Sequence, residues 1–463
     1  MKSVSVLLIF SVCLAVVNGA DGAPFNLADL AFQRSWSSGS KDAAGKEMNA
    51  TEIMHLVPHG GKLYAATSQW MESDPKTPRA SAILVLDRPE GKWRVDHQFN
   101  TDALRLVSMR EVTFTTDAKG KAIKPVAILL AGPDATKGGD GKHAIYSLND
   151  ATGRWERIIL GDATETTTTR AIGFHRDSVT GVDMVFAGVS GVRKSTVGDA
   201  SLGVIPGVYD PTRRGRVRWG DESEVKVPAG ERVMGFAEAN GKIYCATSRH
   251  IYLRHDGAAP RWEEVYFNRK ETSPVGIRGL TGVPNPSGRG EVLIFVALSS
   301  VRTLDPSNGY ADSLELDIPK FVSKQLGVPV TWVLAAYNRF TPYRAPGSDS
   351  TVWLFGFESI YPKRFFESTP KPGVGVFVRD AKEPKLHFAV EARYMIREMT
   401  GSEIHYRMGT IADSEGRALV APRDIVPSPF PNDAALYFGG FDCNDQPSHH
   451  TGWIYRGEFR GGN

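Results

Sequence analysis

Apolar residues in this chain recur in short runs that share one ending. Each run closes on an aspartate, a short turn rich in Gly, Pro or Arg follows, and the next strand usually carries a tryptophan. Because runs joined by a short turn are typical of paired strands, each copy predicts a β-hairpin, and the regular recurrence indicates a repeat architecture. The complete copies end in Asp87 and Trp93, Asp150 and Trp155, Asp210 and Trp219, and Asp256 and Trp262, and weaker copies without the tryptophan end at Asp305 and Asp380.

A second pattern lies upstream of the hairpins, where an aromatic or aliphatic residue is followed by small residues. Such strands suit a crowded axis at which neighbouring sheets approach closely. The mean interval between the closing aspartates is about 59 residues, longer than the roughly 40 to 50 residues of common propeller blades, so the excess is predicted to lie in loops. Seven copies predict seven blades, and they begin at Tyr64, Leu130, Phe186, Tyr244, Phe295, Phe355 and Phe438.

A charged residue opens a third element upstream of the small-residue strands. Together the elements give four antiparallel strands per unit, and a four-stranded sheet repeated radially is a β-propeller. The predicted fold class is therefore an all-β, seven-bladed β-propeller that forms a single domain over residues 20–463. The opening residues are Glu52, Arg105, Arg170, Arg232, Arg278 and Arg423, with Trp332 as the equivalent in the sixth copy.

The two ends of the chain predict how the ring closes. The last unit has a strand over residues 452–456, but little chain follows it to form a fourth strand. The N-terminal segment 31–36 has the pattern of a fourth strand without a blade of its own. Pairing the two segments would close the ring and remove two exposed sheet edges.

Two of the long connections predict short helices. Residues 319–326 begin with Pro319 and are followed by Gly327, the usual punctuation of a short helix. Residues 391–399 end before Gly401, and a further strand is predicted directly after that glycine, over residues 403 to 407. Both helices are expected to cover part of the channel mouth, on the face where long loops gather.

The N-terminal residues predict export. Met1 and Lys2 precede an apolar run from Val4 to Val17 and then small residues, which is the pattern of a secretory signal over residues 1–19. The run is too short for a membrane helix, and no later run approaches about 18 apolar residues. Lys and Arg number 55 against 52 Asp and Glu, so the net charge is +3, without the basic block of a nucleic-acid binder. We expect a secreted protein, extracellular or periplasmic, with no membrane span and no nucleic-acid partner.

The arginines among the opening residues predict a collar at the channel entrance. Guanidinium groups bind planar carboxylates or sulfates through two parallel hydrogen bonds, so a cluster of them favours an anionic ligand. The alternative is a structural role, because the same groups could bond nearby carbonyls and acids, with Glu52, Glu231 and Asp424 as available partners. The collar residues are Arg105, Arg170, Arg232, Arg278 and Arg423.

Histidine and tyrosine residues predicted on the same face are candidates for acid–base chemistry. Abstraction of a proton next to a carboxylate needs a base near neutral pH, a cation for the enolate-like state and an acid for the leaving oxygen, and His, Arg and Tyr can fill these roles. This is the chemistry of β-elimination from uronic acids, and a solvated loop is the alternative for the adjacent histidines. The catalytic candidates are His405, Tyr406, His449 and His450, and Trp70, Tyr361 and Arg407 join the collar as candidates for ligand binding.

Metal binding is a third possibility, because Asp442, His449 and His450 could offer oxygen and nitrogen ligands. Adjacent histidines rarely point at one ion, and the spacing matches no metal-binding signature. No metal and no cofactor are predicted.

The order of elements resembles that of seven-bladed β-propellers of exported proteins, over nearly the whole chain after residue 19. The resemblance is architectural, because the chain lacks the Asp box of sialidases, the WD dipeptide, the kelch double glycine and the tryptophan motif of quinoproteins. Propeller polysaccharide lyases are similar in scaffold and in their use of His, Tyr and Arg. This similarity implies a protein that binds an acidic carbohydrate or small anionic ligand and cleaves the carbohydrate by β-elimination. A propeller that binds a glycan or a protein without catalysis is the alternative.

Overall fold

The computed structural model describes most of the chain. The predicted signal at residues 1–19, the weak repeat at Asp380 and the candidates Trp70, His449 and His450 lie outside the described residues. The described residues are 26–28, 30–69, 80–99, 103–135, 144–160, 167–191, 203–228, 231–270, 276–330, 332–361, 374–377, 386–389, 392–411, 421–442 and 451–459.

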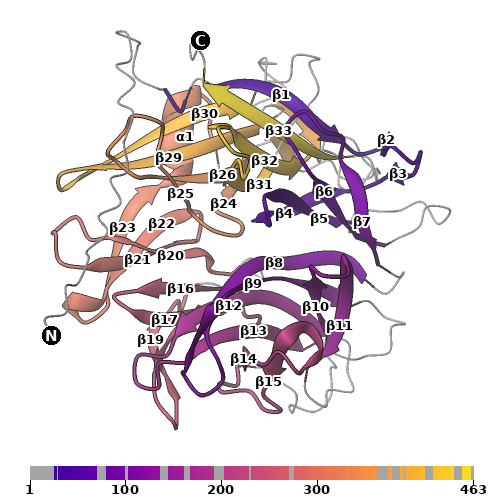
Figure 1. The fold of residues 1–463 in the computed structure, drawn as a ribbon. Helices are drawn as coiled ribbons and strands as arrows, with labels where there is room; N and C mark the ends of the chain where they lie inside the picture. Colours follow the sequence, from indigo (N-terminus) through magenta and orange to yellow (C-terminus); the bar gives the residue numbers. More distant parts are fainter. Residues whose placement is uncertain are drawn as a thin grey trace, which may run out of the picture.

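Antiparallel sheets of four main strands follow one another along the chain (Figure 1). Two of them are separate: β16 (Gly235–Ala239), β17 (Lys242–Ala246), β18 (His250–His255) and β19 (Arg261–Phe267); and β20 (Arg278–Pro284), β21 (Glu291–Ala297), β22 (Ser300–Asp305) and β23 (Ala311–Asp317). Three more are joined at their inner ends: β4 (Glu52–His59), β5 (Lys62–Ser68), β6 (Ala82–Leu86) and β7 (Arg94–Gln98); β8 (Ala103–Thr116), β9 (Ala122–Ala135), β10 (Ala144–Asn149) and β11 (Arg154–Ile159); and β12 (Thr167–Arg176), β13 (Asp183–Gly191), β14 (Val204–Tyr209) and β15 (Val217–Trp219).

The remaining strands form a sheet interrupted at its first strand and a sheet that uses both ends of the chain. The interrupted sheet contains β24 (Trp332–Ala335), β25 (Thr341–Tyr343), β26 (Val352–Tyr361), β29 (Ala392–Thr400) and β30 (Glu403–Ile411), with β27 (Val374–Phe377) and β28 (Leu386–Ala389) added at one side. The other contains β31 (Ala421–Pro427), β32 (Leu436–Phe441), β33 (Gly452–Phe459) and β1 (Leu30–Ser37). Short elements complete the list: β2 (Ser40–Lys41), β3 (Glu47–Met48) and the 3-10 turns Arg214–Arg216 and Pro306–Asn308.

The first strands of successive sheets contact one another around the centre. β4 contacts β8, β8 contacts β12, β12 contacts β16, β16 contacts β20, and β31 contacts both β26 and β4. This radial arrangement of antiparallel sheets is a β-propeller, which confirms the predicted all-β class (Figure 1). The count of seven blades and the closed ring stay predictions, because some sheets merge and one carries extra strands.

The N-terminal strand lies in the sheet formed by the end of the chain, as the sequence predicts. β1 pairs antiparallel with β33, so that Trp36 lies opposite Ile454 and Ser37 opposite Trp453. Phe32 packs edge-on against Phe438 of β32, with ring centroids 5.3 Å apart. The last sheet is therefore completed by a strand from the other end of the chain.

One of the two predicted helices is present and the other is a strand. α1 (Ile318–Leu326) begins after Asp317, whose side chain accepts a hydrogen bond from Lys320 N at 3.0 Å. It is the only α-helix among the described residues, and no described helix is long and apolar enough to cross a membrane. Residues predicted as the second helix form β29, which pairs with β26 and with β30. The glycine expected to end a helix, Gly401 at φ +62, instead sits in the tight turn between two strands.

The tryptophans of the recurring phrase contact the preceding sheet. Trp93 Nε1 donates to Ser35 Oγ of β1 at 2.9 Å, and Trp155 Nε1 donates to Asp96 Oδ2 of β7 at 2.8 Å. Both indole rings are buried. These two tryptophans bring apolar surface to the contact with the preceding sheet, and the N–H of each has a hydrogen-bond partner there.

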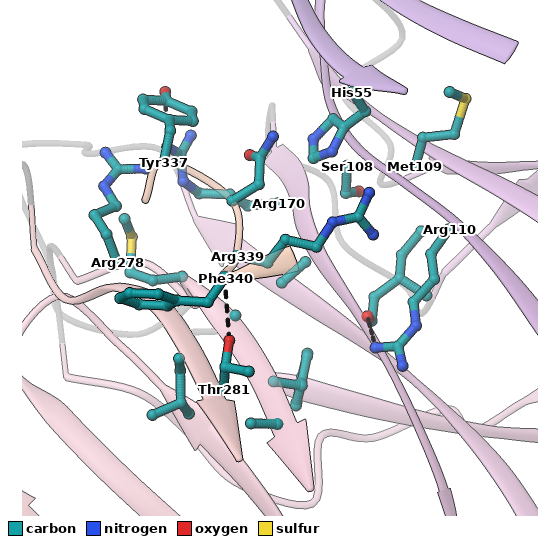
Figure 2. A pocket seen from close by; sticks show the side chains of 18 of the residues that line it. His55, Ser108, Met109, Arg110, Arg170, Arg278, Thr281, Tyr337, Arg339 and Phe340 are labelled. Carbon is teal, nitrogen blue, oxygen red and sulfur yellow. Dashed lines mark hydrogen bonds between the residues drawn. The ribbon is translucent and has the colours of Figure 1, made fainter. Parts of the chain in front are cut away.

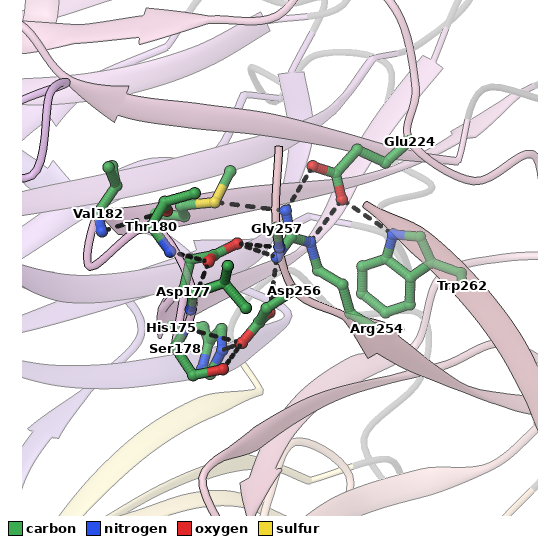
Figure 3. Close-up of polar contacts among 12 residues, drawn as sticks. His175, Asp177, Ser178, Thr180, Val182, Glu224, Arg254, Asp256, Gly257 and Trp262 are labelled. Carbon is green, nitrogen blue, oxygen red and sulfur yellow. Dashed lines mark hydrogen bonds and ion pairs between the residues drawn. The ribbon is translucent and has the colours of Figure 1, made fainter. Parts of the chain in front are cut away.

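Two of the recurring aspartates bind a histidine of the preceding sheet. His59 Nε2 lies 2.8 Å from Asp150 Oδ1, and His59 Nδ1 lies 2.7 Å from Glu111 Oε2. His175 holds Asp256 in the same way, at 3.0 Å (Figure 3). Burial by itself lowers the pKa of both histidines, but their hydrogen bonds to carboxylates outweigh burial and raise the pKa above its ordinary value of 6.5.

A buried arginine reinforces the second of these contacts. Arg254 Nη1 donates to Asp177 at 2.9 Å and to Asp256 at 2.7 Å, and its Nε and Nη2 donate to Glu224 (Figure 3). Glu224 also accepts from Trp262 Nε1 at 2.9 Å. Every charge in this cluster has a partner of opposite sign, so the cluster joins two sheets and leaves no cation free for a ligand.

Replacing His59 with Gln is expected to destabilise the fold more at low pH than at high pH. A group whose pKa is raised on folding contributes its full stabilisation below its unfolded pKa of about 6.5, and loses it as the pH rises through the folded pKa. We expect a loss of about 2 kcal/mol near pH 5.5 that shrinks towards about pH 9, measured by urea unfolding. His255→Gln is the control, because His255 pairs with Glu263 at the surface. An equal loss at both ends of the pH range would contradict the prediction.

Candidate functional site

A break in one innermost strand carries Tyr337 towards the centre of the propeller. β24 and β25 both pair with β26, and residues 336–340 between them leave the ladder. The departure begins at Ala336, whose φ of +46 is unusual for a residue with a side chain. Asn338 Nδ2 anchors the loop by donating to Met54 O of β4 at 2.5 Å.

Three guanidinium groups surround the phenol of Tyr337. Arg170 Nη2 donates to Tyr337 Oη at 3.3 Å. The guanidinium carbons of Arg278 and Arg423 lie 4.3 and 4.4 Å from the centroid of the ring. Cations at such distances are attracted to the face of an aromatic ring and more strongly to a phenolate.

The arginines change the acidity of Tyr337. Burial by itself raises the pKa of Tyr337, and the charge of Glu52 acts in the same direction. The positive charges of the neighbouring arginines, led by Arg170 and Arg278, outweigh both and lower the pKa to about 7. Phenol and phenolate are therefore both present near neutral pH, as is required of a side chain that takes up and releases a proton.

β-Bulges direct two of these arginines into the channel. In β12 the pairing passes from Thr169 to Ala171, and in β31 it passes from Pro422 to Asp424. The residues left out of the ladder are Arg170 and Arg423. A bulge gives one extra residue to the strand and re-aims its side chain. By contrast, Arg105 is paired within its ladder, so the collar arginines do not occupy equivalent positions in their sheets.

Two collar arginines have carboxylate partners. Arg105 Nη2 bonds Asp134. Arg423 Nε lies 3.1 Å from Glu52 Oε2, and its Nη2 lies 3.5 Å from Glu358 Oε2. The charges of Arg105 and Arg423 are therefore already balanced by acidic side chains, as the alternative structural role of the collar predicts.

The other three collar arginines have no carboxylate at ion-pair distance among the described residues. These are Arg170, Arg232 and Arg278; the expected partner Glu231 bonds Arg249 instead, at 3.0 Å. The Nε of Arg278 is buried and, within the described part of the chain, has no hydrogen-bond partner. Burial lowers the pKa of Arg278 to about 9; the charge of Tyr337 opposes this shift, and the positive charges of Arg170 and Arg423 add to it. An unbalanced buried cation is costly, and a bound anion would remove that cost.

A cavity of about 530 Å³ opens beside Tyr337 and extends along the channel. Figure 2 shows Tyr337 and Arg278 at one side of the cavity and Arg110 at the other. Phe236 and Phe340 contribute apolar walls. A cavity of this size with apolar walls and a few charged groups is typical of a small-molecule site.

The five predicted collar residues are brought together around Tyr337. Arg170, Arg278 and Arg423 contact it directly. Arg105 and Arg232 lie close enough for their charges to interact with Tyr337, and Arg232 is exposed. The predicted grouping of these arginines is thus observed, while their role in binding stays a prediction.

The structure does not bring His405, Tyr406 and Arg407 to the collar. They lie on β30, the end strand of its sheet, which corrects the expectation that this segment covers the channel mouth. Tyr406 Oη donates to Glu315 of β23, whereas His405 points to the opposite, exposed face of the strand. Residue alternation along a strand separates adjacent side chains in this way. Tyr361 ends β26, and its side chain lies outside the description.

Sequence reasoning missed Tyr337, Arg339 and Arg110 as site residues. The available signal was the irregular sixth repeat, in which no charged residue opens the first strand and a Tyr-Asn-Arg run interrupts apolar residues. Arg110 lies in the same strand as Arg105 and was hidden because β8 continues much further than the repeat suggested.

Among the described residues, no group of three or more His, Cys, Asp or Glu side chains is arranged to hold a metal ion. Asp442 is described, but its predicted neighbours His449 and His450 lie outside the described residues.

No family model matches the chain, and no curated protein matches it. Solved structures match over most of its length. The Dos1 propeller matches with a TM-score of 0.44 and 12% identity, over 92% of this chain and 84% of that chain. A NanB sialidase from Streptococcus pneumoniae matches with a TM-score of 0.37 and 12% identity, over 94% and 71%. An α-L-arabinanase from Penicillium chrysogenum matches with a TM-score of 0.39 and 11% identity, over 92% and 97%. These are similarities of fold.

Titration of the folded protein is expected to show one tyrosine that ionises near pH 7. Tyr337→Phe should remove this transition, and Arg170→Gln should move it to higher pH because a charge that favours the phenolate is lost. The measurement is the ultraviolet absorbance of tyrosinate. Arg302→Gln serves as the control, because Arg302 pairs with Asp312 on an outer hairpin. A transition near pH 7 that persists in Tyr337→Phe would assign the ionisation to another group.

Proposed function

We propose that this protein is an exported propeller that binds an acidic carbohydrate at the arginine collar and cleaves it by β-elimination, with Tyr337 as the base. The proposal is carried by one observation: a phenol with a pKa of about 7 lies against guanidinium groups, and two of these, Arg170 and Arg278, lack a described carboxylate partner.

Binding would supply the negative charge that the collar lacks. A uronate carboxylate placed against Arg170 and Arg278 can accept paired hydrogen bonds from planar guanidinium groups. The apolar walls at Phe236 and Phe340 suit the faces of a sugar ring, and polar groups along the cavity suit its hydroxyls. Arg232, which is exposed, adds attraction for an approaching anion.

The reaction needs one base and one proton donor. The Tyr337 phenolate removes the proton from the carbon next to the carboxylate, and the arginines stabilise the negative charge that moves onto the carboxylate oxygens. The electron pair then forms a carbon–carbon double bond as the bond from the neighbouring carbon to the glycosidic oxygen breaks. The Tyr337 hydroxyl, now protonated, returns its proton to that oxygen. No oxidant or external acid is required.

The alternative is binding without catalysis, and the positions of the predicted catalytic residues favour it. Because His405 and Tyr406 lie away from the collar, Tyr337 would have to act as both base and acid. A binder would use the same arginines and cavity for an acidic glycan or an acidic segment of a protein, with Tyr337 serving only to balance charge.

The lyase proposal is tested with polygalacturonate. The purified protein is expected to produce ultraviolet absorbance from the unsaturated uronate product. Tyr337→Phe should lower kcat by about a hundredfold or more while leaving KM near its original value, because the lost group acts in proton transfer. Arg278→Gln should weaken binding about tenfold, because one charge-assisted contact is lost. Arg302→Gln is again the control.

Two results would argue against this function. Retention of polygalacturonate without product, with Tyr337→Phe binding as well as the original protein, would leave the non-catalytic alternative. Absence of both binding and product with polygalacturonate, alginate and hyaluronan would overturn the assignment of an acidic carbohydrate altogether.

A further inference from the structure

A second group of cations lines the cavity beyond the collar. Arg110 projects from β8, and Arg339 projects from the loop between β24 and β25 (Figure 2). The two guanidinium groups are close enough to repel each other: burial, and then the like charge of Arg339, lower the pKa of Arg110 to about 10. Like charges held together in a cavity are typical of an anion site.

Arg110 has no carboxylate partner among the described residues. Its one side-chain hydrogen bond runs from Nη1 to the carbonyl oxygen of Ile172, at 3.0 Å. The nearest acidic residue of the cavity wall is Glu238, but this carboxylate is bonded to His175 Nδ1 at 2.5 Å. The charge of Glu238 is thus already matched by a histidine whose own pKa is raised.

Arg339 is only partly satisfied. Its Nη2 donates to Asp424 Oδ2 and to Leu56 O, each at 3.2 Å. Asp424 also accepts from the backbone N–H of Leu56 at 2.9 Å, so its charge is shared. The Nε of Arg339 is buried without a hydrogen-bond partner in the described part of the chain. Buried donors of this kind are normally satisfied, so an additional acceptor is expected here.

The two cationic groups belong to one cavity but lie at different depths. Arg170 and Ile172, the residue that Arg110 bonds, are two positions apart on β12, which corresponds to about 7 Å along the strand. Both Arg170 and Arg110 line the same space of about 530 Å³. A ligand held at the collar can therefore extend to the second group without leaving the cavity.

A neutral histidine lies in the same part of the wall. Burial lowers the pKa of His55, which keeps the ring uncharged near neutral pH. Its Nε2 lies 2.9 Å from the carbonyl oxygen of Val107, so Nε2 carries the hydrogen and Nδ1 is left as an acceptor. An acceptor beside two cations suits a ligand that carries hydroxyl groups as well as negative charge.

We propose that Arg110 and Arg339 form a second carboxylate subsite, so that the ligand is an acidic oligosaccharide with at least two uronate units, one carboxylate at the collar and the next deeper in the channel. The inference rests on the proposed function and deepens it. In this arrangement the collar binds one uronate unit of an oligosaccharide. Arg110 and Arg339 then favour oligosaccharides over single acidic sugars.

The experiment compares galacturonic acid with trigalacturonic acid by ligand-observed NMR titration. Arg110→Gln is expected to weaken trigalacturonic acid about tenfold, the loss of one charge-assisted contact, and to leave galacturonic acid unchanged. Arg278→Gln, at the collar, should weaken both ligands. Arg339→Gln should repeat the effect of Arg110→Gln, which keeps the test valid if one variant folds poorly. Arg302→Gln and the fully methyl-esterified trimer are the controls for protein and ligand charge.

The outcomes separate the subsite from the proposed function. If Arg110→Gln and Arg339→Gln, with unchanged urea midpoints, weaken neither ligand or weaken both equally, the second subsite is overturned while the collar stands. If Arg278→Gln leaves both ligands unaffected, or the original protein binds neither, the collar itself is wrong and the inference falls with it. Tight binding of the esterified trimer would show that charge does not select the ligand.

Discussion

Positive charge confined in a narrow space is the constraint on which the centre of this molecule depends. Arginines enter the channel from several sheets, and their mutual repulsion is strong where little water remains to screen it. Glu52 and Glu358 balance Arg423, but no described carboxylate reaches Arg170 or Arg278. The excess positive charge lowers the pKa of Tyr337, which therefore loses its proton more readily than an ordinary tyrosine. The acidity of one phenol is thus set by charges on four different strands, β4, β12, β20 and β31.

The scaffold holds these charges in place by joining its sheets with fully paired polar groups. Arg254 is surrounded by three carboxylates, and His59 and His175 each bridge to the next sheet. The channel differs from these contacts in its charge balance: Arg254, His59 and His175 each meet a carboxylate, whereas Arg170 and Arg278 meet none among the described residues. Repulsion at the centre can persist because the surrounding contacts prevent the strands from moving apart.

Much of the architecture could be predicted from the sequence because similar strand patterns recur along the chain. Some of the recurring residues make similar contacts between neighbouring sheets: Trp93 and Trp155 each donate to the preceding sheet, and Asp150 and Asp256 each bind a histidine there. The bulges at Arg170 and Arg423 leave no such mark, because one extra residue in a strand does not alter its composition. Tyr337 was missed for a related reason. It lies in the irregular sixth repeat, so no residue at the corresponding position of the other repeats points to it. The helix predicted over residues 391–399 is wrong, because Gly401 suits the end of a helix and a hairpin turn equally and the segment forms β29 instead.

The position of β1 has a consequence for how the chain acquires its structure. Among the described strands, β1 pairs only with β33, so it has no partner until a segment more than four hundred residues later has been synthesised. Until β33 has been synthesised, β1 has no strand to pair with. An unpaired strand edge favours association with other chains. The pairing of β1 with β33 joins residues far apart in the sequence, and pairings of this kind carry a large entropic cost before they form.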